Sequence, residues 1–158
     1  MLVRIVTTIL MFTLYQSVFA QSLTGQPSIK LAVNQKDSAE SLLKEGLQKY
    51  RDGQYQDALK LYQDALQIFQ DQKNISAERA VLQKIGVTHN KLGKYENALK
   101  YFQQAMSLNQ QIKDRTGEAS ILNDIAGTYQ LKGSFPEALQ TFQQALAIRR
   151  EVKDRVGE

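Results

Sequence analysis

The sequence predicts an all-α fold in which helix pairs stack into a solenoid. The prediction rests first on three near-copies of one phrase, QYQDALKLYQDAL at residues 54–66, KYENALKYFQQAM at 94–106 and SFPEALQTFQQAL at 134–146. Equivalent aromatic residues stand at a fixed interval of 40 residues, at Tyr55, Tyr95 and Phe135. A fixed period of about 20–50 residues is typical of stacked repeats, because one repeat cannot bury its apolar face alone.

Composition sets the outer limits of the interpretation. The 158 residues, 42% of them hydrophobic, give room for one domain with a buried core. Because the chain has no cysteine, disulfides, zinc–thiolate sites and thiol nucleophiles are excluded. The formal net charge is +4 without a block of basic residues, so we expect no nucleic-acid partner.

The first twenty residues do not follow the repeat. Arg4 is their only charge, and an apolar run follows from Ile5 to about Tyr15. In the sequence Val18-Phe19-Ala20, small or medium side chains then stand at the −3 and −1 positions that a signal peptidase recognises. This pattern predicts a signal peptide over residues 1–20, cleaved after Ala20, and export to the periplasm or the medium. An uncleaved anchor is the alternative, but the run is shorter than the roughly 20 apolar residues of a bilayer span, so we expect no stable span after cleavage.

Residues 21–37 are predicted to be a flexible leader. They are mostly polar, carry Gly25 and Pro27, and show no apolar periodicity.

Each repeat is predicted to contain two helices. The repeated phrase carries an apolar stripe at helical spacing, as in Ala58, Leu59, Tyr62, Ala65, Leu66 and Phe69. A second apolar pattern precedes it, as AVLQKIGVTHNKLG in the second copy and SILNDIAGTYQLKG in the third. The predicted repeats are residues 39–72, 79–112 and 119–152, and residues 153–158, KDRVGE, are predicted to start a further repeat because they match KDRTGE at 113–118.

Turn and capping residues mark the predicted helix ends. Glycine is expected to end each first helix in a left-handed conformation, at Gly53, Gly93 and Gly133. Predicted N-terminal caps are Asp37 with Glu40 for the first helix of copy one, Asp114 for that of copy three, and Ser134 with Glu137 for the last helix.

Small and aromatic residues recur at equivalent positions in the three predicted helix pairs. The small residues Gly46, Gly86 and Ala126 on the first helices, with Ala58, Ala98 and Ala138 on the second, predict close packing within the pair. The aromatic residues Tyr62, Phe102 and Phe142 are expected to fill space towards the neighbouring pair.

This order of residues resembles the tetratricopeptide repeat. The resemblance is carried by Leu82, Ile85, Gly86, His89, Ala98, Phe102 and Ala105, and again by Leu122, Ile125, Ala126, Tyr129, Ala138, Phe142 and Ala145. Copy one departs from it at Glu45 and Lys49. The resemblance implies a right-handed α-solenoid with a concave, protein-binding surface. The long period is similar to kinesin light chains and to bacterial arrays that follow a signal peptide or precede a caspase-like CHAT peptidase domain.

No catalytic, metal or cofactor site is predicted. His89 is the only histidine, and it occupies the position where the third copy has Tyr129, so we expect it to pack in the core. One histidine without cysteine cannot build a transition-metal cluster, and no glycine-rich phosphate loop is present. We therefore expect no enzymatic activity in this chain.

The resemblance places the candidate partner site on the concave side of the first helices. The expected groove residues are Gln83, Lys84, Val87, Asn90, Lys91, Asn123, Gly127 and Gln130, with Glu40, Leu43, Leu47, Tyr50, Ala80 and Asp124 at other inward positions. The amides among them could bind the backbone of an extended peptide. Asn123 also matches a groove asparagine of kinesin light chains. The alternative is that these amides are polar residues that favour a helix and its solubility and have no role in binding.

Three functions remain open on the sequence. The first is an exported, non-enzymatic module that binds a protein or peptide in its groove. The second is the N-terminal sensor arm of a longer enzyme such as a CHAT-type peptidase. The third is a structural envelope component that associates through the C-terminal end of the array, where the last apolar face is otherwise exposed.

Overall fold

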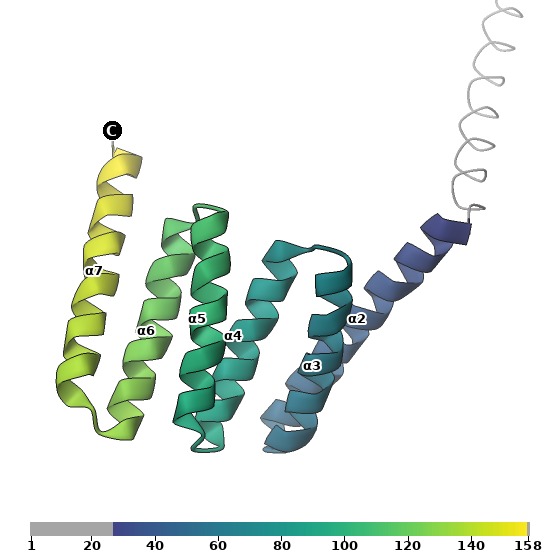
Figure 1. The fold of residues 1–158 in the computed structure, drawn as a ribbon, viewed down its shortest axis with the longest axis horizontal. Coiled ribbons are helices and arrows are strands. Elements are labelled where there is room, and N and C mark those ends of the chain that lie inside the picture. Colours follow the sequence, from purple (N-terminus) through teal and green to yellow (C-terminus); the bar gives the residue numbers. More distant parts are fainter. Residues whose placement is uncertain (1–26, 158) are drawn as a thin grey trace, which may run out of the picture. The chain divides into compact units, whose positions relative to one another are not determined.

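The computed structural model describes residues 27–157, and this part of the chain is entirely helices and short turns. The predicted signal peptide and the first six residues of the predicted leader lie outside it. The helices, in chain order, are α2 (Pro27–Arg51), α3 (Tyr55–Asp71), α4 (Ile75–Lys91), α5 (Tyr95–Gln111), α6 (Arg115–Lys132) and α7 (Phe135–Gly157) (Figure 1). The predicted all-α fold is confirmed.

The helices from Ala39 onwards form one unit of stacked antiparallel pairs. Each helix from α3 to α6 packs against the next helix in the chain, and α4 also contacts α6 (Figure 1). The first helices of successive repeats are therefore neighbours. This arrangement is an α-solenoid, as the 40-residue period predicts.

The turns within the pairs use glycine as predicted. Gly53, Gly93 and Gly133 have φ values of 76°, 67° and 82°, which is the left-handed region. The turns between pairs instead place lysines there, with φ of 54° at Lys73 and 57° at Lys113. Sequence reasoning did not find these two positions, because lysine has no preference for that conformation.

The first helix begins earlier than predicted. α2 starts at Pro27, so residues 27–37 of the predicted leader are helical, and Asp37 lies inside the helix instead of capping it. Proline is well suited to the first turn of a helix, and no second proline interrupts α2 before Arg51. The prediction was guided by apolar periodicity, which residues 27–37 lack, although a helix can form without it.

Capping side chains begin the other first helices. The side chain of Asp114 accepts the N–H of Gly117 at 2.8 Å, which confirms its predicted role. Asn74, which sequence reasoning missed, does the same for Ala77 at 3.1 Å. Both helices thus begin four residues before the predicted starts of their repeats. Ser134 stands directly before α7, where its carbonyl accepts the N–H of Ala138.

The last helix is longer than predicted. Residues 153–157, which were predicted to start a further repeat, continue α7 without a turn. The equivalent lysines of earlier copies, Lys73 and Lys113, turn the chain through a positive φ. That conformation costs a non-glycine residue roughly 1–2 kcal/mol, and the packing of a following helix offsets the cost in those two turns.

Aromatic rings and small residues fit together inside each pair. Ala58, Ala98 and Ala138 are buried, which agrees with the predicted close packing. The rings of Tyr62 and Phe102 lie against the glycine of their own pair as well as towards the next pair, which the prediction had not included.

Candidate functional site

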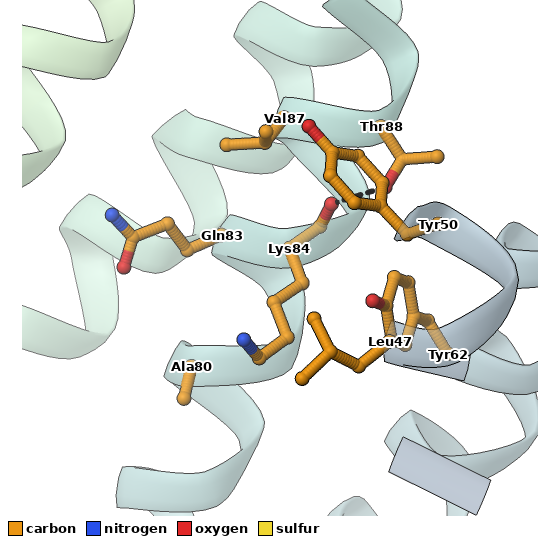
Figure 2. A pocket seen from close by; sticks show the side chains of 8 residues that line it. All are labelled: Leu47, Tyr50, Tyr62, Ala80, Gln83, Lys84, Val87 and Thr88. Atoms are coloured by element: carbon orange, nitrogen blue, oxygen red, sulfur yellow. Dashed lines mark hydrogen bonds between the residues drawn. The ribbon is translucent and has the colours of Figure 1, made fainter. Parts of the chain in front are cut away.

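Two adjoining hollows run along the first helices and contain all eight predicted groove residues. The first, of about 350 Å³, is lined by Leu47, Tyr50, Tyr62, Ala80, Gln83, Lys84, Val87 and Thr88 (Figure 2). The second, of about 490 Å³, is lined by Val87, Asn90, Lys91, Asn123, Asp124, Gly127, Gln130 and Leu131. Because Val87 belongs to both, the two hollows form one continuous surface, named here the groove.

The first hollow is mainly apolar and lies between two pairs. Figure 2 shows the rings of Tyr50 and Tyr62 with Leu47 on one side and the α4 residues on the other. Tyr62 is buried, and this burial raises the pKa of its hydroxyl. The hydroxyl of Thr88 donates to the carbonyl of Lys84 at 2.7 Å, so it is not available to a ligand as a donor.

The second hollow has more polar side chains than the first, and hydrogen bonds in and beside it join the two first helices α4 and α6. Asn90 on α4 donates from Nδ2 to Oγ1 of Thr128 on α6 at 2.8 Å. Gln83 donates from Nε2 to Oδ2 of Asp124 at 2.5 Å. The side-chain oxygen of Asn90 is buried and has no hydrogen-bond partner.

These bonds change the role of two predicted residues. Gln83 and Asn90 were expected to offer both a donor and an acceptor to a peptide, but their N–H groups bind neighbouring side chains of α6. Asn123 and Gln130 make no such bond in the described part of the chain. Asp124 directly follows Asn123 and was expected at an inward position, but its pairing with Gln83 was not predicted.

The carboxyl group of Asp124 has a perturbed acidity. Burial raises its pKa, and the hydrogen bond from Gln83 partly opposes that effect by stabilising the anion. Lys84 and Lys91, the two cations of the groove, make no ion pair among the residues whose side chains are described.

His89 packs in the core, outside both hollows. It is 7% exposed, and its ring stacks on Tyr101 with 5.3 Å between centroids. Burial and the nearby charge of Lys94 lower its pKa, and its Nδ1 atom has no hydrogen-bond partner. The described residues also contain no cluster of three potential metal ligands. None of the described helices is long and apolar enough to cross a bilayer.

A second polar network, absent from the sequence predictions, joins the ends of successive pairs. Arg79 on α4 donates to Oδ1 of Asn109 at 2.7 Å and to Oδ2 of Asp114 at 2.5 Å. Further along, Arg115 pairs with Glu118 and, at 2.8 Å, with Glu151. Apart from Glu118, which lies three residues after Arg115, the partners are 30 to 36 residues apart, and such a spacing carries no local signal in the sequence.

Comparison with known proteins decides what the repeats are. The model of the tetratricopeptide repeat family matches residues 78–151. This segment consists of tetratricopeptide repeats. No curated protein sequence matches the chain.

Solved tetratricopeptide structures share the fold. The tetratricopeptide domain of Arabidopsis FLU is 23% identical, with a TM-score of 0.68 over 75% of this chain and 98% of that one. A putative kinesin light chain of Podosopora anserina with nearly identical repeats is 17% identical, with a TM-score of 0.65 over 87% of this chain and 63% of that one. The second tetratricopeptide domain of Spaghetti (RPAP3), solved bound to the HSP90 peptide SRMEEVD, is 21% identical, with a TM-score of 0.55 over 76% of this chain and 99% of that one.

Proposed function

We propose that this tetratricopeptide array is an exported, non-catalytic binding module that holds an extended segment of a partner protein along the groove. The observation that carries the proposal is that all eight predicted residues line two adjoining hollows on consecutive first helices. A preformed groove lowers the cost of binding, because only the partner segment has to be ordered.

Each hollow fits a different part of the partner segment. The first offers aromatic and aliphatic walls, at Tyr50, Tyr62 and Val87, for one apolar side chain. The second offers the amides of Asn123 and Gln130 to the peptide backbone, because neither makes a side-chain hydrogen bond in the described part of the chain.

The charges of the groove favour an acidic partner segment. Lys84 lines the first hollow and Lys91 the second. The one carboxylate of the groove, Asp124, already accepts a hydrogen bond from Gln83. We therefore assign the groove a segment with an apolar residue and at least one acidic residue. The acidic peptide bound to Spaghetti shows that this fold can hold such a segment.

Selection from a displayed library of random 12-residue peptides tests the groove. Enriched peptides are measured by titration against the unchanged protein and against Gly127→Leu. A Cβ atom on Gly127 meets no atom within 4 Å, so leucine there enters the second hollow without disturbing the fold. The matched control is Gln103→Leu, at an exposed site of α5 outside the groove.

We expect Gly127→Leu to weaken an enriched acidic peptide at least tenfold and Gln103→Leu to leave it unchanged. Lys84→Gln should weaken it as well, and more at low salt. Peptides that bind both leucine variants equally well would place the binding site elsewhere.

Export rests on residues 1–20 and is tested separately. The intact mass of the protein from its native cells should correspond to a chain that begins at Gln21. A chain that retains Met1 would contradict cleavage and leave the groove proposal unaffected.

A further inference from the structure

The last helix exposes a continuous apolar stripe. Phe135, Leu139, Phe142 and Leu146 are 65%, 61%, 38% and 47% exposed, and they follow one face of α7 (yellow in Figure 1). We name these four residues the α7 stripe. Ala138, Thr141 and Ala145 on the adjacent face are buried, so α7 is firmly seated while its stripe remains in solvent.

The equivalent positions of α3 and α5 are buried or half-buried. The residues equivalent to Leu139 and Phe142 in α3 are Leu59 and Tyr62, which are 6% and 1% exposed. In α5, Phe102 at the same position as Phe142 is fully buried. The face is therefore built to be covered, and its exposure in α7 is a departure from the pattern of the molecule.

The opposite end of the stack cannot cover it. In α4 the residues that pack on α3 include Val81 and Ile85, both fully buried. The equivalent residues of α2 are Ser41 and Glu45, both exposed. Because α2 presents a polar residue and a charge where an apolar contact is needed, stacking of copies head to tail would bury an unpaired carboxylate.

The stripe is complementary to itself. Its residues are separated by four, three and four positions, so the pattern reads the same in both directions. In an antiparallel pair of α7 helices about a twofold axis, Phe135 would face Leu146 of the second copy, and Leu139 would face Phe142. Apolar positions at intervals of three and four are the requirement for knobs-into-holes packing of two helices.

Charge does not oppose such a pair. Residues 138–148, ALQTFQQALAI, contain no charged side chain, whereas the equivalent residues of α3 include Lys60 and Asp64 and those of α5 include Lys100. In a twofold pair each charge near the axis would meet its own copy, so their absence from α7 removes that repulsion.

We propose that two copies of this chain associate through their α7 stripes, antiparallel and about a twofold axis. The surface is separate from the groove, so each dimer carries two grooves for partner segments. Such a dimer binds a partner with two segments more tightly than one array can, by raising the effective concentration of the second site.

Sedimentation equilibrium of the full chain tests the association. We expect a species of twice the mass of one chain, and Leu139→Lys should lower the association constant at least 100-fold. The matched control is Gln140→Lys, which places the same charge on the neighbouring exposed residue, away from the stripe. A monomer at high concentration, or a dimer that persists in Leu139→Lys, would overturn the proposal.

Cross-linking tests the geometry. Because the chain has no native cysteine, a disulfide between two introduced cysteines shows that these two positions meet. A mixture of Leu139→Cys and Phe142→Cys proteins should form a mixed disulfide under mild oxidation. A mixture of Glu45→Cys and Phe142→Cys should not, and a strong link there would show head-to-tail stacking and refute the twofold pair.

Discussion

The ring of Phe102 on α5 lies so close to Gly86 on α4 that no side chain fits at residue 86. A Cβ atom on Gly86 would lie 2.6 Å from Cε1 of the Phe102 ring. The ring is fully buried, so it cannot move aside into solvent. Gly46 and Tyr62 show the same relationship in the preceding pair, where the corresponding distance is 2.7 Å. The close packing of each pair therefore depends on this glycine.

The first prediction concerns Gly86→Ala. The added methyl group should force the ring of Phe102 off its position and lower the free energy of unfolding by about 1–3 kcal/mol. Gly127→Ala is the control, because that glycine is also inside a helix but has open space at its Cβ position. There alanine should raise stability by roughly 0.5–1 kcal/mol through its better helix propensity. Urea denaturation followed by circular dichroism measures both, and effects of the same sign would contradict the packing argument.

The repeat architecture was predictable because its signals are local. The 40-residue period, the apolar stripes and the glycine turns each lie within a few residues of one another, and the structure agrees with all three. Burial of the alanines at 58, 98 and 138 followed from the same pattern. The extent of the first and last helices was not predictable in this way, because α2 and α7 continue through residues with no apolar periodicity.

The groove was only half predictable. Helical phase, read together with the family resemblance, placed the eight residues on one face, and the structure gathers them in two adjoining hollows. Phase does not say which polar groups are already used, because that depends on partners about 40 residues away. The bonds from Gln83 to Asp124 and from Asn90 to Thr128 need the stacking distance between α4 and α6, which no local pattern contains.

The second prediction compares two helix caps. Asn74→Ala removes one capping bond and should cost about 0.5–2 kcal/mol of stability. Asp114→Ala removes a cap and also the partner of Arg79, so it should cost about 1 kcal/mol more. The added amount is small because both side chains of the ion pair are partly exposed, at 27% and 31%. Thermal denaturation of both variants measures the difference, and equal losses would show that the Arg79 bond adds nothing.

The third prediction concerns the pH dependence due to His89. Its folded pKa is lowered by burial and by Lys94, so the unfolded chain binds a proton more readily than the folded chain does. This contribution to stability is complete above about pH 6.5, the ordinary pKa of histidine, and is lost as the pH falls towards the folded pKa. His89→Phe keeps a ring against Tyr101 and should flatten the stability profile between about pH 5 and 7. A profile unchanged by this substitution would assign the pH dependence to other groups.

The fourth prediction concerns Asp124, where the sign is opposite. Burial raises its folded pKa, so the neutral form is favoured in the folded chain, and this contribution is complete below about pH 3.9. It is lost as the pH rises through the folded pKa, where the buried group must ionise. Asp124→Asn keeps an oxygen to accept from Gln83 and carries no charge, so it should gain stability relative to the unchanged protein between about pH 4 and 7.

Paired denaturation curves at pH 4 and pH 7 measure this difference. Asp64→Asn is the control, because it makes the same chemical change at an exposed site on α3, outside the groove. A loss of stability in Asp124→Asn that is largest at pH 7 would mean that the anion and its bond from Gln83 hold α4 to α6. The groove would then depend on a charged link between repeats. The negative charge of Asp124 would also repel an acidic segment, so such a segment would bind more weakly than it would beside a neutral Asp124.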